Sequence, residues 1–395
     1  MSEISATTSS LPMAPLLALS SAYFMVGTCS LCVIGLVLPI SENLNISPPD
    51  VAWLVTVFAL TFAVAAPLGQ ILFSRLARVR ILCGGLFLMA GGMALAAFAP
   101  DYETLFISRA ILGVGAALVS PMCSALGAGM VAPHQQGRAM AIVFGGLTVA
   151  TVVGVPLSAW LGSQIGWRTV MAIIAVTAMV SMSAILVLVR DRSAGAASGI
   201  GHLIAALTER RSSLAILATF LQMASLFCTY ALIAPYMVYK FEINPDEVFL
   251  MLLIYGSFGV LGNVFAGRFS DRFGPDRVII VSIIATTLAF LAMLITGSAL
   301  WIGLAILCIW AVTGMIFHTP QQQRIVSISV DQRSLLLALN ASALYLGMSL
   351  GAGISRTASI HWGYDSLPAL SAGVMMLCGL VFFASTRSLK AVPAR

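Results

Sequence analysis

The chain alternates between long apolar runs and short polar connections. Twelve of the runs approach the roughly 20 helical residues that cross a hydrocarbon core of about 30 Å. They lie near 15–40, 51–73, 79–99, 103–131, 139–163, 168–189, 214–239, 248–269, 278–297, 299–319, 333–358 and 366–386. Because backbone polar groups in lipid must be paired within their own segment, these runs predict membrane-spanning helices.

The longest polar connection, 190–213, falls between the sixth and seventh runs. Its Gly, Ala and Ser residues are followed by HLIAALTERR, which is typical of a linker ending in a short amphipathic helix on the membrane surface. We therefore expect an N-terminal six-helix bundle over 1–189, a cytoplasmic linker over 190–213 and a C-terminal six-helix bundle over 214–395.

The two halves of the chain carry a weak internal repeat. A shift of 197 positions relates Arg75 to Arg272, Arg80 to Arg277, Ser74 to Asp271, Gly154 to Gly351, and Gly166 to Gly363. One shift that serves distant regions indicates a tandem duplication, which is common in transporters. The expected fold is an all-α membrane protein whose twelve transmembrane helices form two pseudo-symmetric bundles.

Composition agrees with this class. Hydrophobic residues make up 60% of the chain and charged residues 9%, and the mean hydropathy is +1.02. Soluble domains carry about 25% charged residues, so a soluble enzyme or binding module is excluded.

The basic residues are unevenly shared between the connections. If the N-terminus is cytoplasmic, the outer connections hold Arg168, Lys240 and Arg356, and Arg109 lies inside a run, which leaves 16 of the 20 Lys and Arg residues on the inner side. Basic connections stay in the cytoplasm, so we expect an inner-membrane protein with both termini cytoplasmic. The net charge of +6 is then a topology signal, and no nucleic-acid partner is expected.

Metal and cofactor chemistry has little support. All seven cysteines fall within the runs, and the four histidines are scattered. Cys29 and Cys32 form a CxxC pattern, but buried cysteines in a span more often pack as small hydrophobes. We expect no cofactor and no metal. The runs also hold no acid pair and no nucleophile beside a base, so no enzyme activity is expected.

Several motifs together resemble the major facilitator superfamily. They are the two sets of six runs, GRFSDRFGPDR at 267–277, the arginine of the fourth run, the glycine and proline series of the fifth run with its following GWR, and LALNASALYLG in the eleventh run. Within that family the chain resembles the bacterial twelve-span efflux proteins for drugs, sugars and nucleosides, which are similar to drug:proton antiporters. The resemblance implies the major facilitator fold and no enzymatic activity.

The resemblance also implies an inner gate. Asp271, supported by Arg272, Gly267 and Gly274, would bind the end of a facing helix and hold the cytoplasmic side closed. A carboxylate is favoured at a helix N-terminus by about 0.3 to 1 kcal/mol. In the first half the corresponding residues are Ser74 and Arg75, and the uncharged serine implies a weaker lock. The alternative is a turn whose charges serve topology alone.

Two further features of the resemblance concern the interior. Gly154 and Pro156 match a fifth-span motif that would press that helix against a neighbour and seal the pathway, although ordinary small-residue packing explains them almost as well. Arg109 matches an arginine used in coupling. A charge within the bilayer costs about 2.5 to 3.5 kcal/mol, so it suggests function. The alternative is that Arg109 reaches the outer interface.

The polar residues of the runs indicate a pathway independently of the family. Apart from Arg80 and Arg168 at their starts, the third, sixth, ninth and twelfth runs contain no Gln, Asn, His, Arg or Tyr, and we therefore expect them to face lipid. The expected substrate cavity is lined by Arg109, Gln222, Tyr230, His318 and Asn340. The acidic residues all fall in connections or near the ends of runs, so the coupling of protons would rest on His318 or on Asp271. A cavity without an acid favours neutral or anionic solutes.

The leading hypothesis is a secondary transporter that exports a small organic solute, with proton exchange, through alternating access of the two bundles. Its expected partners are the solute, protons and the lipid bilayer, and we expect a monomer. Uptake or facilitated exchange on the same scaffold is the alternative. A membrane sensor or structural protein has less support, because the sequence shows no sizeable soluble domain.

Overall fold

The computed structural model describes residues 11–73, 75–132, 135–190, 208–329 and 333–390. In this part of the chain twelve helical segments are long and apolar enough to span a membrane, and no strand is present. The helices of the first half are α1 (Met13–Leu44), α2 (Pro48–Leu72), α3 (Arg78–Ala97), α4 (Tyr102–Gly129), α5 (Gln136–Val149), the π-helical turn η2 (Ala150–Gly154), α6 (Val155–Ile165) and α7 (Trp167–Leu188).

The second half has the same plan. Its elements are α9 (Arg210–Tyr230), α10 (Ile233–Phe241), the short 3-10 turn η3 (Pro245–Glu247), α11 (Val248–Phe273), α12 (Pro275–Ile295), α13 (Leu300–Ile316), α14 (His318–Ile328), α15 (Arg333–Trp362) and α16 (Ser366–Lys390). The predicted all-α fold with twelve spans is confirmed. Most of the predicted linker, residues 191–207, lies outside the described residues, so the domain boundaries stay a prediction.

Three glycines make the tightest helix connections. Gly166, Gly274 and Gly363 have φ angles of 81°, 83° and 75°, a left-handed region that glycine enters without steric cost. Gly166 and Gly274 are each the single residue between two helices, and Gly363 begins the three-residue connection between α15 and α16. Gly166 and Gly363 are also related by the predicted shift of 197 positions, so the same connection recurs in both halves.

Several predicted helix ends are wrong. The tenth run was expected to end at 319, but after a break at Phe317 the helix continues as α14 to Ile328. Pro320 lies in the first turn of α14, three residues after the break, which agrees with the disruption that a proline causes in the turn before it. The eighth run was expected to end at 269, yet α11 runs to Phe273.

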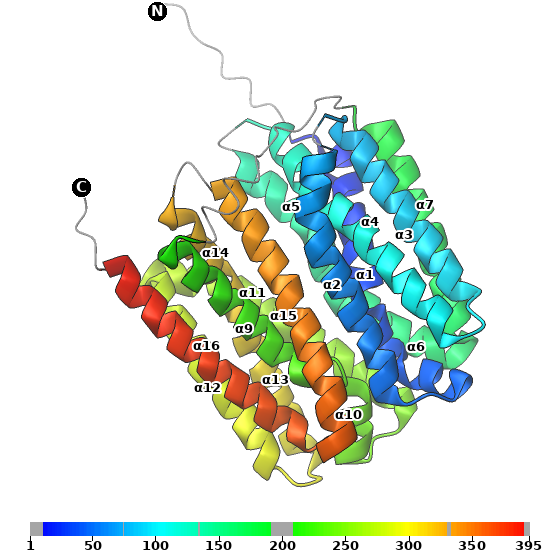
Figure 1. Cartoon of the computed structure of the whole chain (residues 1–395), viewed down its shortest axis with the longest axis vertical. Helices are drawn as coiled ribbons and strands as arrows, with labels where there is room; N and C mark the ends of the chain where they lie inside the picture. The colour runs from blue at the N-terminus through cyan, green and yellow to red at the C-terminus, as the bar shows by residue number, and fades with distance from the viewer. Residues whose placement is uncertain (1–10, 74, 133–134, 191–207, 330–332, 391–395) are drawn as a thin grey trace, which may run out of the picture.

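The helices form two groups that lie side by side (Figure 1), α1 to α7 in one and α9 to α16 in the other. We call these the N-bundle and the C-bundle. The start of α1 and the end of α16 lie at the same end of the molecule, which we call the termini side, and the opposite end is the far side. Helices α2 and α15 run next to each other where the bundles meet.

The third, sixth, ninth and twelfth spans are α3, α7, α12 and α16, and each packs on helices of its own bundle. Their outer faces carry large apolar side chains that are more than half exposed, among them Phe87, Val176, Leu288 and Leu380. Exposed apolar faces of this extent suit contact with lipid acyl chains.

Candidate functional site

Arg109 of α4 is enclosed in the N-bundle, with 1% of its surface exposed. Its guanidinium donates to the backbone carbonyls of Cys29 at 2.6 Å, Ser30 at 2.8 Å and Leu54 at 3.3 Å. It also lies 4.8 Å from the centre of the Phe58 ring. The alternative that this side chain reaches the outer interface does not hold, because α1 and α2 supply its partners. In the structure Arg109 lies in packed protein and does not line an open cavity.

The glycine series of the fifth span packs against α1. A Cβ atom at Gly146 would lie 1.8 Å from the Ser20 carbonyl oxygen, and one at Gly154 would lie 2.7 Å from the Thr28 hydroxyl oxygen. Pro156 is buried at the start of α6, directly after the π-helical turn. Gly154 and Pro156 therefore lie where tight packing was expected, with α1 as the neighbour; a sealing role stays a prediction.

The π-helical turn also reaches the other bundle. A Cβ atom at Gly256 of α11 would lie 2.8 Å from the Thr151 carbonyl oxygen and 2.9 Å from the Val152 Cα atom. Both neighbours are backbone atoms, which cannot rotate away. The two bundles approach this closely because position 256 has no side chain.

A second contact between the bundles is polar and lies at the far side. Arg356 at the end of α15 donates to the Asp50 carboxylate at the start of α2, from Nη2 at 2.6 Å and from Nε at 2.9 Å. The same guanidinium lies 5.6 Å from the Trp53 ring centre. We call the Asp50–Arg356 pair the far-side latch.

The contact continues along α2 and α15 toward the middle of the molecule. Thr56 and Ser349 each donate a hydroxyl to the other's backbone carbonyl, both at 3.2 Å. One and a half turns further along α2, Phe62 stacks on Tyr345 with ring centres 3.6 Å apart. Between residues whose side chains the structure describes, the hydrogen bonds and ion pairs that join the bundles lie in the far-side half of α2 and α15. The far side of the molecule is closed.

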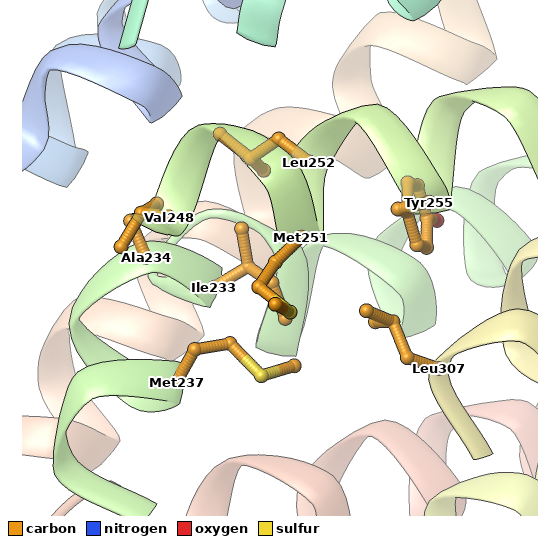
Figure 2. Close-up of a pocket in the computed structure, with 8 residues that line it drawn as sticks. All are labelled: Ile233, Ala234, Met237, Val248, Met251, Leu252, Tyr255 and Leu307. Atoms are coloured by element: carbon orange, nitrogen blue, oxygen red, sulfur yellow. The ribbon is translucent and has the colours of Figure 1, made fainter. Parts of the chain in front are cut away.

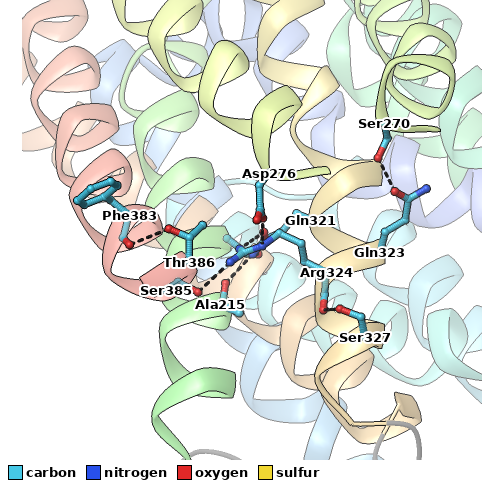
Figure 3. A network of polar contacts seen from close by, with 11 residues as sticks. Ala215, Ser270, Asp276, Gln321, Gln323, Arg324, Ser327, Phe383, Ser385 and Thr386 are labelled. Carbon is cyan, nitrogen blue, oxygen red and sulfur yellow. Dashed lines mark hydrogen bonds and ion pairs between the residues drawn. The ribbon is translucent and has the colours of Figure 1, made fainter. Parts of the chain in front are cut away.

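Asn340 belongs to a buried polar network in the C-bundle. Its Oδ1 accepts from the Thr219 hydroxyl at 2.6 Å, and Thr219 in turn accepts from Gln321 Nε2 at 3.2 Å. Gln321 also donates to the Ala215 carbonyl at 2.7 Å and accepts from Arg324 Nη1 at 3.2 Å (Figure 3). The network joins α9, α14 and α15.

Arg324 is the charged centre of this network and was missed. It is 3% exposed, forms an ion pair with Asp276 at 2.7 Å and donates to the Ser385 hydroxyl at 3.2 Å. The Phe382 ring lies 4.4 Å from its guanidinium carbon. The sequence placed Arg324 in an inner connection because QQQR follows a proline, whereas α14 carries it inside the bundle.

Gln222 and Tyr230 lie on the α9 face that meets α11 and α13. Gln222 is 1% exposed and donates from Nε2 to the Gly314 carbonyl at 3.1 Å. Tyr230 is 7% exposed and stacks on Tyr255 with ring centres 4.8 Å apart. Both predicted residues thus belong to one interhelical junction.

His318 begins α14 and is half-buried, with its ring edge-on to Phe317 at 6.1 Å. The next residue, Thr319, donates to Asn263 of α11 at 3.1 Å. Of the five predicted cavity residues, four therefore lie in the C-bundle and Arg109 lies in the N-bundle. The structure does not bring Arg109 into contact with the other four.

The predicted gate residues are mostly unengaged. Asp271 and Arg272 lie on the last turns of α11, are exposed, and Asp271 makes no hydrogen bond or ion pair with another described residue. Near this end of α11, the carboxylate that forms an ion pair is that of Asp276, and its partner is Arg324. Gly274 makes the sharp connection, while Gly267 has open space around its Cβ position. Arg75 is exposed, and Ser74 lies outside the described residues.

One ionisable contact lies in a connection outside the spans. Asp365, between α15 and α16, accepts from Lys240 at 2.7 Å and from the Tyr239 hydroxyl at 3.1 Å. The hydrogen bond from the Lys240 ammonium, helped by that of Tyr239, holds the pKa of the Asp365 carboxyl below its ordinary value. This contact ties the end of α10 to the α15–α16 connection. Among the described residues no group of His, Cys, Asp and Glu has the arrangement of a metal site.

Comparison with known proteins agrees with the two-bundle architecture. The family model described as Major Facilitator Superfamily matches residues 19–214 and again 215–394. The inner membrane transport protein YdhP of Escherichia coli K12 is 30% identical over 378 residues, which cover 94% of this chain and 96% of YdhP. The uncharacterized MFS-type transporter YbcL of Bacillus subtilis is 26% identical over 371 residues, covering 92% and 94% of the two chains.

A solved structure shares the fold. It is a bacterial homologue of the human lysosomal transporter Spinster, described as inward-facing and unoccupied, with a TM-score of 0.77 over 98% of this chain and 100% of that chain at 15% identity. The relatives are transport proteins and not enzymes, and the twelve apolar helices make this chain a multi-pass inner-membrane protein. Because one family model matches both halves, the chain belongs to the Major Facilitator Superfamily.

Proposed function

We propose that the protein exports a small organic solute across the cytoplasmic membrane by alternating access, in exchange for protons. Both termini are cytoplasmic in this proposal, so the termini side is the inner side and the far side is the outer side. The two bundles rock about their contact, and the solute enters from the cytoplasm when the outer side is closed. The working unit is a monomer.

The observation that carries the proposal is the closure of the far side. The Asp50–Arg356 latch and the paired hydroxyls of Thr56 and Ser349 join the bundles there, and Phe62 stacks on Tyr345 near the middle of α2 and α15. At the termini side Asp271, the expected inner lock, is unengaged. This asymmetry supports an inward-facing state, in which a cytoplasmic solute would load.

The interior charges support a coupling role. Arg109 is a fully buried cation bonded to carbonyl oxygens instead of a carboxylate, an arrangement whose cost argues for function. His318 lies in the termini-side half of the C-bundle, and its imidazole is a group that can bind and release a proton. We assign Arg109 and His318 to coupling, and Gln222, Tyr230 and Asn340 to the solute pathway.

The test is solute flux in proteoliposomes with an imposed pH gradient, screened over antibiotics, sugars and nucleosides. Export predicts that a gradient acidic on the outer side drives solute toward that side and that the solute moves protons in the opposite direction. Solute movement that follows the proton gradient in the same direction would favour uptake by symport. Movement without any effect of pH would favour a facilitator, and no movement of any screened solute would favour the non-transport reading.

A further inference from the structure

Helix α11 changes character along its length. In its far-side half, Met251 and Tyr255 are buried and line a small apolar pocket together with residues of α10 and α13 (Figure 2). In its termini-side half, the side chains of Phe265, Phe269 and Phe273 are 39%, 40% and 47% exposed. The last turns of this span therefore present aromatic rings to the surroundings of the protein.

These three rings form one continuous row, which we call the phenylalanine stripe. The ring centres of Phe265 and Phe269 are 5.7 Å apart, and those of Phe269 and Phe273 are 6.3 Å apart. Each residue of an α-helix turns the chain by about 100°. Phe269 follows Gly256, which meets the N-bundle, by thirteen residues and so lies about 140° from it around the helix axis. The stripe therefore faces away from the N-bundle, toward the lipid beside the C-bundle.

Two arginines accompany the stripe. Arg268 and Arg272 are exposed, and the guanidinium carbon of Arg272 lies 5.2 Å from the centre of the Phe273 ring. Neither arginine forms an ion pair with another described residue. They lie one turn apart, about 6 Å along the helix axis, and like charges at this spacing destabilise a helix. An anion bound between the two guanidinium groups would remove this repulsion.

The nearby carboxylates do not supply that anion. Asp276 is held in the ion pair with Arg324 at 2.7 Å (Figure 3). Asp271 follows Phe269 by two residues, which places it about 160° away around the helix, on the side toward the N-bundle. Arg277, exposed in the first turn of α12, adds a further positive charge. Among the described residues, the side of α11 that carries the stripe is therefore positively charged without a counter-ion.

We propose that Arg268 and Arg272 bind the phosphate of an anionic phospholipid, such as phosphatidylglycerol, whose acyl chains lie along the phenylalanine stripe. Guanidinium groups match phosphate oxygens in geometry, and basic groups at the end of a span attract anionic lipids. A zwitterionic lipid fits less well, because its own cation faces the same arginines. The exposed rings favour a lipid over a free anion, since only a lipid brings apolar chains to cover them. This binding requires no particular solute, direction or coupling of transport.

The probe is phosphatidylglycerol with two oleoyl chains, titrated onto the purified full-length protein in detergent and counted by native mass spectrometry. Phosphatidylcholine with the same chains is the matched lipid, since it keeps the phosphate and the apolar part but has no net charge. We expect phosphatidylglycerol to bind at least fivefold more tightly. Equal binding of the two lipids would overturn the proposal. Loss of the bound lipid on addition of inorganic phosphate would assign the arginines to a free anion and would also overturn it.

Variants locate the site. The double change Arg268→Gln and Arg272→Gln removes both guanidinium groups and should weaken the binding of phosphatidylglycerol about tenfold. The control is Arg75→Gln with Arg138→Gln, which removes the same charge from exposed positions of the N-bundle and should change the affinity less than twofold. An equal loss in both double variants would show attraction to charge in general and would reject a site on α11. Unchanged affinity in the folded Arg268 and Arg272 variant would reject it as well.

A measurement on the wild type keeps the proposal testable if that variant does not fold. Phosphatidylglycerol with a photoreactive diazirine near the start of one acyl chain is cross-linked to the protein, and the labelled peptides are identified by mass spectrometry. We expect the main labelled peptide to contain Phe265 and Phe269. Labelling spread evenly over the lipid-facing helices, α3, α7, α12 and α16, would overturn the proposal.

Discussion

Neutralising the far-side latch should open the far side of the protein. Asp50→Asn keeps the size of the side chain and an oxygen that can accept a hydrogen bond, but it removes the charge that pairs with Arg356. The change acts on the contact between α2 and α15, and it therefore affects the equilibrium between closed and open far sides.

The size of the effect follows from the geometry of the latch. The two donors of Arg356 share one carboxylate oxygen at 2.6 and 2.9 Å, but the side chains of Arg356 and Asp50 are 37% and 35% exposed. Exposed ion pairs contribute about 0.2 to 1 kcal/mol, and the paired donors place this one near the upper end. A loss of about 1 kcal/mol changes a two-state ratio about fivefold, since 1.4 kcal/mol is tenfold.

The assay is a distance measurement between spin labels on the far side. Labels at Glu103→Cys and His361→Cys, in a protein freed of native cysteines and held in lipid nanodiscs, report the separation of the N-bundle and the C-bundle. In Asp50→Asn the ratio of long to short distances should rise about fivefold. The exchange Asp50→Arg with Arg356→Asp should return the ratio toward the wild-type value.

The proposed role of the latch is rejected if Asp50→Asn leaves the distance distribution unchanged while the labelled protein remains folded. It is also refuted if the charge exchange gives the same distribution as the single neutralisation, because the effect would then come from α2 itself and not from the pair.

Four further changes test other contacts. Gly256→Ala places a methyl group against the backbone of the π-helical turn and should widen the far-side distance, whereas Gly267→Ala, which has open space, should not; equal effects would reject the close approach. Asp276→Asn leaves the buried Arg324 without its ion partner and should lower the free energy of unfolding by about 2 kcal/mol. The loss is smaller than for a fully buried pair because the Asp276 side chain is 42% exposed. An unchanged melting temperature would contradict this expectation. The folded-state pKa of Asp365 is depressed from its ordinary value of 3.8, so the contribution of this carboxylate to stability is present above that pH and is lost as the pH falls below it. Asp365→Asn should therefore flatten the pH dependence of the melting temperature below about pH 4. An unaltered pH profile would exclude the contact. Asp271→Asn should leave membrane levels normal and cripple flux if the inner lock forms in the outward-facing state, and normal flux would remove it from the gate.

The spans could be predicted because their signal is local. A run of about 20 apolar residues identifies a membrane helix without knowledge of its neighbours. The glycine connections at Gly166 and Gly363 were likewise visible as one repeated residue type at a fixed shift. Such features depend on the local residue types, which set how well a segment suits lipid and which backbone angles it can adopt.

The contacts that close the far side could not be predicted, because they depend on tertiary packing. Asp50 follows two prolines and was read as part of a connection, and its partner Arg356 is 306 positions away in the chain. Arg324 was assigned to a connection because it follows Pro320, while the groups that make its burial tolerable come from other helices. Arg109 was recognised as buried from its position, yet the backbone carbonyls that satisfy it carry no sequence signature.

Transport by alternating access requires the two bundles to separate at the far side in each cycle. The most direct test joins them there with a disulfide between Thr56→Cys and Ser349→Cys in a protein freed of native cysteines, reconstituted into proteoliposomes with a solute identified by the flux screen. We expect oxidation to abolish flux and reduction to restore it, and we expect either single cysteine variant to be unaffected by oxidation. Undiminished flux through fully cross-linked protein would contradict it.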